Sequence, residues 1–203
     1  GEGTVFGLGF PMASATSATV SPRRLLDVIE SDVLPLTAAG VATGNKVFGA
    51  AILRKSDLAL VIAGTNDETD NPLWHGEVHT LKQFYELADR PPTSELVFVT
   101  THEPCTMCMS AITWDGFDNY YYFFSHEDSR DSFAIPHDLL ILKELYGCEP
   151  GGYHRSNAFW TAYSIPELAD SSCGEQIARI RTRYQELSQV YQDSKGDNDI
   201  PLA

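Results

Sequence analysis

The residues with the clearest chemical potential form two short segments. The first is Trp74-His75-Gly76-Glu77, and the second is Glu103-Pro104-Cys105-Thr106-Met107-Cys108. Together they give H-x-E followed by P-C-x-x-C. A catalytic zinc ion takes three protein ligands and leaves one position open, and one imidazole with two thiolates is a suitable set. The sequence therefore predicts a zinc site made of His75, Cys105 and Cys108.

Both segments stand where a helix is expected to begin. A helix N-terminus carries partial positive charge and free N–H groups, which favour a thiolate over a thiol. Positions i and i+2 of a regular helix point about 200° apart at 3.6 residues per turn. His75 and Glu77 can therefore share a pocket only at the helix end. There Glu77 would lie beside the metal without binding it and would move protons between water and substrate.

These motifs also have plainer interpretations. A lone C-x-x-C fits a redox pair or half of a structural zinc site equally well. His79 would share a helix face with His75, but a metalloprotease-type helix needs Glu directly after the first His, where this chain has Gly76. We expect His79 to be hydrogen-bonded or at the surface and His102 to be structural. A closed, purely structural site would need a fourth protein ligand, for which His79, His102 or Cys148 is available.

The amino-acid composition and charge indicate which class of substrate and which cell compartment to expect. The chain has 203 residues, which suits one domain, and 14 basic residues against 28 acidic ones give a formal net charge of -14. A protein that grips nucleic acid normally concentrates Lys and Arg, so a small-molecule substrate is favoured. The cysteines do not suggest a disulfide framework. No apolar run of about 18 residues is present, and no Lys or Arg precedes Arg23 as a secretory leader requires. We expect a cytoplasmic protein with no membrane span.

Hydrophobic spacing, proline and glycine indicate the elements that position the two segments. We expect one helix from Ser21-Pro22 to Pro35, a second that starts near His75 and a third that opens at Pro104-Cys105. Two more helices are expected over 136–146 and 175–191. Expected strands cover 47–53, 58–63, 96–100 and 120–124, the first two as an antiparallel hairpin. This order predicts a layered sheet covered by helices, with some parallel pairing. We expect a flexible arm over 1–20, one domain over 21–195 that ends in a helical extension, and a frayed tail over 196–203.

The H-x-E and P-C-x-x-C pair resembles the signature of zinc-dependent base deaminases, the cytidine deaminase superfamily. The chain looks closest to the branch of yeast-type cytosine deaminase, bacterial guanine deaminase and tRNA adenosine deaminase, over about residues 48–124. Phe48-Gly49-Ala50 resembles the first core strand of that family. The resemblance implies a three-layer α/β/α fold with a mixed sheet of about five strands, a zinc cofactor and a homodimer. It also implies hydrolytic deamination of a nucleobase, nucleoside or related small heterocycle, with release of ammonia.

The substrate contacts that follow from this resemblance are less specific. Asn66 resembles the Asn that hydrogen-bonds substrate in this branch, and Asp128 falls where guanine-deaminase-like members place acidic residues. Glu103 precedes Pro104-Cys105 as in tRNA adenosine deaminase, and Trp74 would stack on a flat ring. The segment 125–164 is longer than a minimal deaminase needs and is expected to close the pocket. Two alternatives stay open: a non-catalytic zinc-binding domain of the same fold, and a deaminase that edits nucleic acid.

Overall fold

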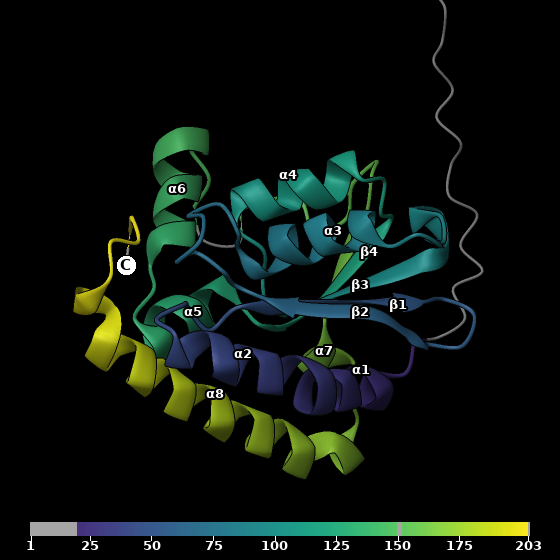
Figure 1. The fold of residues 1–203 in the computed structure, drawn as a ribbon. Helices are drawn as coiled ribbons and strands as arrows, with labels where there is room; N and C mark the ends of the chain where they lie inside the picture. The colour runs from purple at the N-terminus through teal and green to yellow at the C-terminus, as the bar shows by residue number, and fades with distance from the viewer. Residues whose placement is uncertain (1–19, 150–151, 203) are drawn as a thin grey trace, which may run out of the picture.

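A five-stranded mixed sheet forms the middle layer of the computed structural model, which describes residues 20–149 and 152–202 (Figure 1). Its spatial order is β2-β1-β3-β4-β5. β1 is antiparallel to both β2 and β3, whereas β4 is parallel to β3 and to β5. The strands are β1 (Gly49–Arg54), β2 (Leu60–Thr65), β3 (Leu96–His102), β4 (Asn119–Phe124) and β5 (Thr161–Ser164). The predicted hairpin and the predicted three-layer α/β/α fold are both confirmed.

Both faces of the sheet are covered because successive side chains of a strand point to opposite sides. In β1, Ala50 and Ile52 enter one apolar layer, and Ala51 and Leu53 enter the other. The first layer packs under α3 (Gly76–Glu86) and α4 (Thr106–Trp114). These two helices each begin at one of the chemically active segments.

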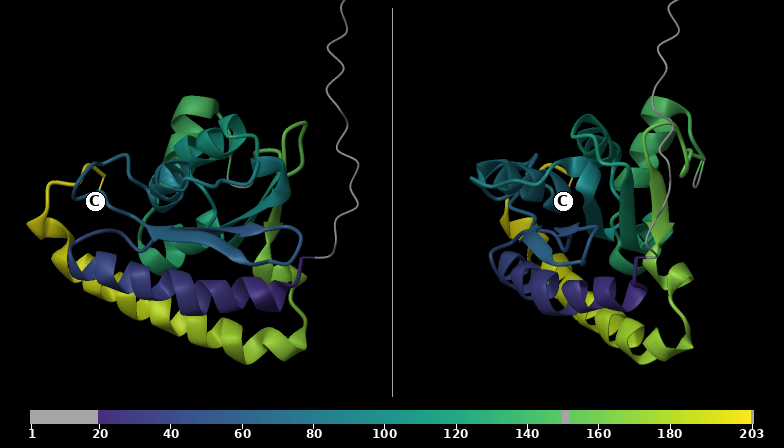
Figure 2. Two further views of the ribbon diagram at one scale, coloured as in Figure 1. Left: turned by 45° about the vertical axis from the view of Figure 1, so that its right-hand side comes forward. Right: turned by 90° about the vertical axis from the view of Figure 1, so that its right-hand side faces the viewer.

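The second face is covered by helices from both ends of the chain. Figure 2 shows α2 (Leu34–Ala42) and α8 (Gly174–Ser194) lying side by side beneath the sheet, as their mutual contacts confirm. α1 (Pro22–Val28) leads into α2, and α7 (Ile165–Leu168) packs on α1. α5 (His126–Phe133) contacts β4 and α8, and α6 (His137–Tyr146) contacts α4 and α5. α6 thus approaches the end of the molecule where α4 begins (Figure 1).

The first helix does not end at Pro35 as predicted. The chain continues through a π-helical turn (Ile29–Val33) into α2, and the Leu34 N–H donates to the carbonyl of Ile29. Proline lacks an N–H and its ring crowds the carbonyl four residues earlier, so a regular α-helix is broken there. The wider π turn accommodates Pro35 at the start of the next helical segment, so the helical path continues.

The sequence-based expectation missed β5, α5 and α7. Ser125 and Asp128 form a capping box at the start of α5. Within the tail predicted to fray over 196–203, Ile200 is buried, and the partly exposed Asn198 donates a side-chain hydrogen bond to the Gly44 carbonyl. The predicted arm over 1–20 lies outside the described residues except for its last residue. No helix in the described part of the chain is long and apolar enough to cross a bilayer.

Candidate active site

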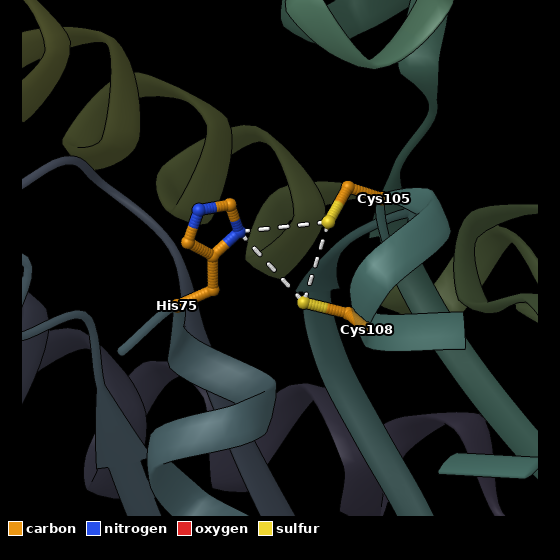
Figure 3. A group of neighbouring side chains, drawn as sticks. All are labelled: His75, Cys105 and Cys108. Carbon is orange, nitrogen blue, oxygen red and sulfur yellow. Dashed lines mark hydrogen bonds between the residues drawn. The ribbon is translucent and has the colours of Figure 1, made fainter. Parts of the chain in front are cut away.

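The two chemically active segments meet because each lies at the start of a helix on the same face of the sheet. His75 is the N-cap residue of α3, and Cys105 is the N-cap residue of α4, which follows β3. Cys108 lies in the first turn of α4. Figure 3 shows the His75 ring directed toward both sulfur atoms. The predicted helix starts are therefore confirmed.

The three donor atoms have the spacing of a zinc ligand set. Nδ1 of His75 lies 3.5 Å from Sγ of Cys105 and 3.8 Å from Sγ of Cys108, and the two sulfur atoms are 3.5 Å apart. Tetrahedral zinc with the usual bond lengths requires about 3.6 Å between N and S and about 3.8 Å between two S atoms. Within residues 20–149 and 152–202, this is the one group of three or more such donors found close together. The donor chemistry and the spacing both fit a zinc ion.

Gly76 lets α3 begin this close to the sheet. A Cβ at this position would stand 2.8 Å from the backbone N and Cα of Gly49 in β1. Such distances are too short for any side-chain carbon, so the first turn of α3 lies directly against β1 only because residue 76 is glycine. The glycine between His75 and Glu77 therefore fixes the position of both.

The three donors also interact electrostatically. The hydrogen bond between Cys105 and Cys108, together with the neighbouring His75, holds the pKa of the Cys105 thiol well below its usual range. Burial and the adjacent Cys105 charge raise the pKa of Cys108. Burial opposes protonation of His75, but the hydrogen bond and negative charge of Cys105 outweigh it and raise its pKa to about 9. Metal binding must therefore displace protons from His75 and Cys108.

Glu77 is a buried carboxyl group beside this cluster. It is 4% exposed, and the Thr100 hydroxyl lies 2.8 Å from its Oε1. Burial raises the pKa of Glu77, and the negative charge of Cys105 adds to the rise. A raised pKa makes the carboxyl group a stronger proton acceptor, which suits a general base that later returns the proton.

Asn66 and Trp74, both predicted to contact substrate, lie in the loop between β2 and α3, ahead of His75. The Asn66 side chain accepts a hydrogen bond from the Gly76 N–H and donates one of 2.6 Å to Oε2 of Glu68. The half-buried Trp74 ring stacks on His79, with a centroid distance of 6.3 Å. Asn66 thus braces the helix start, and Trp74 lies against the next turn of α3.

The carboxylates of Glu103 and Asp128 are engaged with other parts of the chain. Glu103 is 1% exposed and accepts hydrogen bonds from the His126 N–H, the Tyr153 hydroxyl and the Arg155 guanidinium. Arg155 and Tyr153 belong to the segment that leads to β5, so Glu103 ties that segment to the start of α4. Asp128 caps α5 and lies 3.5 Å from Arg181 of α8. Contact of these four residues with a substrate stays a prediction.

The three candidates for a fourth protein ligand have other contacts. Nδ1 of His79 lies 2.9 Å from the Thr65 carbonyl oxygen, and its Nε2 lies 3.2 Å from the Gln83 amide nitrogen. His102 is enclosed by aromatic rings on the opposite side of the sheet from α3 and α4. The Cys148 thiol faces the Tyr146 carbonyl. The described residues therefore offer three donors, so a tetrahedral zinc ion held by them would have one position left for water or substrate.

The sequence did not single out Asp138, in the first turn of α6. Burial and the negative charge of Cys105 raise the pKa of Asp138 to about 7, against the opposing effect of His126. Asp138 therefore lies within electrostatic reach of the cluster. In the sequence Asp138 is simply an acidic residue in the first turn of a helix. Acidic residues are common there because they interact favourably with the helix dipole, so this position does not indicate a functional site.

Comparison with known proteins agrees with the fold and the cluster. Residues 32–124 match the family model of the cytidine and deoxycytidylate deaminase zinc-binding region. The guanine deaminase of Bacillus subtilis (strain 168) is 30% identical over 113 residues, which are 54% of this chain and 70% of the relative. The structure of guanine deaminase from Nitrosomonas europaea aligns with a TM-score of 0.52 and 19% identity over 83% of this chain and 84% of that one. A variant of NE0047 with bound 8-azaguanine aligns with a TM-score of 0.57 and 19% identity over 86% and 98%.

The fold and the match to the zinc-binding region of the family model define a domain of the deaminase class, and the donor cluster lies within the matched residues. The family match and the guanine deaminase relative make the assignment specific. This chain belongs to the cytidine deaminase superfamily, as its two motifs predict.

Proposed function

We propose that the protein is a zinc-dependent aminohydrolase that replaces an exocyclic amino group of a nucleobase-like heterocycle with oxygen and releases ammonia. The observation that carries this proposal is the buried, proton-competent Glu77 beside a His/Cys/Cys donor set with an open fourth position. A structural zinc site needs no such carboxyl group. The guanine deaminase relative supports an amino-substituted purine as the first substrate to test.

In this proposal His75, Cys105 and Cys108 hold the zinc ion. When bound, zinc supplies Lewis acidity and makes water acidic enough to lose a proton near neutral pH. Glu77 accepts that proton as oxygen bonds to the amino-bearing ring carbon, and it delivers the proton to the adjacent ring nitrogen. Glu77 would then take the second proton from the newly bonded hydroxyl group and pass it to the amino group, which leaves as ammonia as the carbon–nitrogen bond breaks and the carbonyl forms. The Thr100 hydroxyl, 2.8 Å from Oε1, holds the carboxyl group in place.

Asn66, Trp74, Glu103 and Asp128 remain the proposed substrate contacts, and we add Asp138 to them. Asp138 lies in the first turn of α6, which packs against α4, and the charge of Cys105 contributes to its raised pKa. Because the chain carries a net charge of -14, an uncharged base or nucleoside is favoured over a phosphorylated substrate or a nucleic acid.

The decisive experiment measures ammonia release from a panel of guanine, cytosine, adenine, their nucleosides, pterins and aminotriazines. We expect wild-type protein with bound zinc to deaminate one or a few of these compounds. Glu77→Gln keeps the size of the side chain but cannot shuttle protons, so kcat should fall by about 100- to 10,000-fold with zinc still bound.

Glu86→Gln is the matched control. Glu86 lies on the same helix but is exposed and pairs only with Lys82 among the described ion pairs. This variant should retain wild-type activity. A zinc-loaded Glu77→Gln protein with more than a tenth of wild-type activity would refute the assigned role. Zinc-loaded wild type that releases no ammonia from the whole panel would favour the non-catalytic alternative.

The homodimer that the resemblance implies is also part of the proposal. Two exposed aromatic side chains on the helices that carry the donor cluster support a homodimer. Tyr85 of α3 is 48% exposed, and Trp114 of α4 is 90% exposed. Light scattering should give twice the mass of the chain for wild type and a lower mass for Trp114→Glu. A monomeric wild type would contradict this part of the proposal.

A further inference from the structure

Glu68 is a second buried carboxyl group next to His75, on the side of the ring that faces away from the sulfur atoms. Its Oε1 lies 3.6 Å from Nε2 of His75, whereas Nδ1 of the same ring faces Cys105 and Cys108. This distance is an ion-pair contact, slightly longer than a well-formed N–H···O hydrogen bond. Glu68 is 3% exposed, so its charge acts on His75 with little screening by water.

A buried lysine and an amide hold Glu68 in this position. Nζ of Lys46 lies 2.9 Å from Oε1 of Glu68, and the two side chains are only 6% and 1% exposed. Asn66 donates a hydrogen bond of 2.6 Å to Oε2 and also accepts one from the Gly76 N–H. The same carboxylate is therefore tied to the first residue of α3 through one amide side chain.

The loop that carries Glu68 is itself fixed on both sides. Thr69 N–H donates to the Asn45 side-chain oxygen at 3.0 Å, and the Asn45 amide donates to the Thr69 hydroxyl at 3.3 Å. Further along, the Asp67 N–H donates to the Trp74 carbonyl at 2.8 Å, which returns the chain to His75. Glu68 is therefore positioned by contacts that do not depend on the metal.

We infer that Glu68 is a positioning residue for the zinc ligand His75. A carboxylate facing Nε2 favours the imidazole form that carries its hydrogen on Nε2 and offers the lone pair of Nδ1 to the metal. It also makes the ring a stronger donor. Lys46 is the buried counter-ion of Glu68 and holds its Oε1 in place.

This inference rests on the proposed zinc-dependent function, but it concerns metal affinity and ligand orientation rather than substrate. The experiment measures zinc affinity by competition with a chromogenic chelator for wild type and Glu68→Gln. We expect about 10- to 100-fold weaker binding in the variant, the range typical for loss of such a partner. NMR of the zinc-loaded proteins should show an exchange-protected, downfield Nε2–H signal of His75 in wild type that moves upfield in Glu68→Gln.

Two further variants separate positioning from general loss of structure. Glu68→Gln leaves Lys46 as a buried unpaired charge, so the double variant Lys46→Met/Glu68→Gln removes both charges and leaves neither without a partner. It should bind zinc as weakly as the single variant. Glu30→Gln is the control, since Glu30 pairs with Arg179 on the face of the sheet opposite the zinc cluster. It should keep wild-type zinc affinity.

Wild-type zinc affinity in the folded double variant, together with an unchanged His75 signal, would overturn the inference. That result would leave the proposed function standing, provided that the wild type binds zinc and releases ammonia. Failure of the wild type to do either would instead count against the proposed function itself.

Discussion

His102 makes the protein acid-sensitive in a way that one substitution should remove. Its ring is 1% exposed and lies 4.6 to 5.8 Å, centroid to centroid, from the rings of Phe48, Phe124, Phe133 and Tyr184. Burial in this aromatic cage lowers the pKa of His102 from 6.5 to about 3. His102 is therefore neutral in the folded protein at every pH at which the protein is normally studied.

The sign of the effect follows from proton uptake. In the unfolded chain His102 recovers an ordinary pKa and binds a proton below pH 6.5, so acid favours unfolding. The stabilisation is fully present above pH 6.5 and is lost progressively as the pH falls toward 3. At pH 5, about 1.5 units below the ordinary pKa of 6.5, protonation of His102 stabilises the unfolded chain by about 2 kcal/mol, at 1.36 kcal/mol per unit. At pH 7 the corresponding cost is about 0.2 kcal/mol.

Urea unfolding at pH 7 and pH 5 tests this for wild type and His102→Phe, with both proteins in the same metal state. Other titrating groups contribute to both proteins, so they cancel when the two pH-dependent changes are subtracted. Wild type should lose about 2 kcal/mol more than His102→Phe between pH 7 and pH 5. Equal losses in the two proteins would refute the reasoning, whatever the absolute stability of the variant.

Three further predictions concern the site and its supports. Gly76→Ala should destabilise the fold by about 1–3 kcal/mol in thermal unfolding because its Cβ would meet the Gly49 backbone at 2.8 Å. Gly174→Ala is the control, since its Cβ meets nothing within 4 Å, and it should change stability by less than about 1 kcal/mol. A chelator should abolish ammonia release, and added zinc should restore it. Removal of zinc should also lower the free energy of unfolding by about 2.7 kcal/mol relative to protein with free zinc at 100 times its Kd. Activity that survives verified metal removal would contradict the proposal. Arg155→Leu should lower the free energy of unfolding by about 1.5–3 kcal/mol because it removes the cation from the buried Glu103. The double variant Arg155→Leu/Glu103→Gln should recover much of that loss, whereas additive losses would argue against coupling of the pair.

The sequence predicted the parts of the fold that depend on local signals. The starts of α3 at His75 and of α4 at Cys105 agree with the structure, as does the hairpin of β1 and β2. Proline positions, apolar spacing and short polar connections are readable within one or two turns of chain. For the same reason, H-x-E and P-C-x-x-C were enough to name the three side chains that form the donor cluster.

Elements that depend on distant partners escaped prediction. β5 has four residues, too few for a periodic pattern, and it is a strand because it pairs with β4. Pro35 was expected to end a helix, but a π turn carries the chain onward to cover the sheet. Local propensity favoured a break there, and the packing of α2 against α8 and the sheet outweighed it.

The sequence by itself determined which three side chains form the His/Cys/Cys donor cluster and where their helices begin, because donor chemistry and helix caps are encoded within a few residues. Only the tertiary structure decided what surrounds those ligands. It set Glu68 against the free nitrogen of His75, brought Arg155 across 52 positions to the buried Glu103, and sealed His102 in an aromatic cage. These contacts depend on how the strands and helices pack, and the spacing of residues along the chain does not encode distances between packed elements.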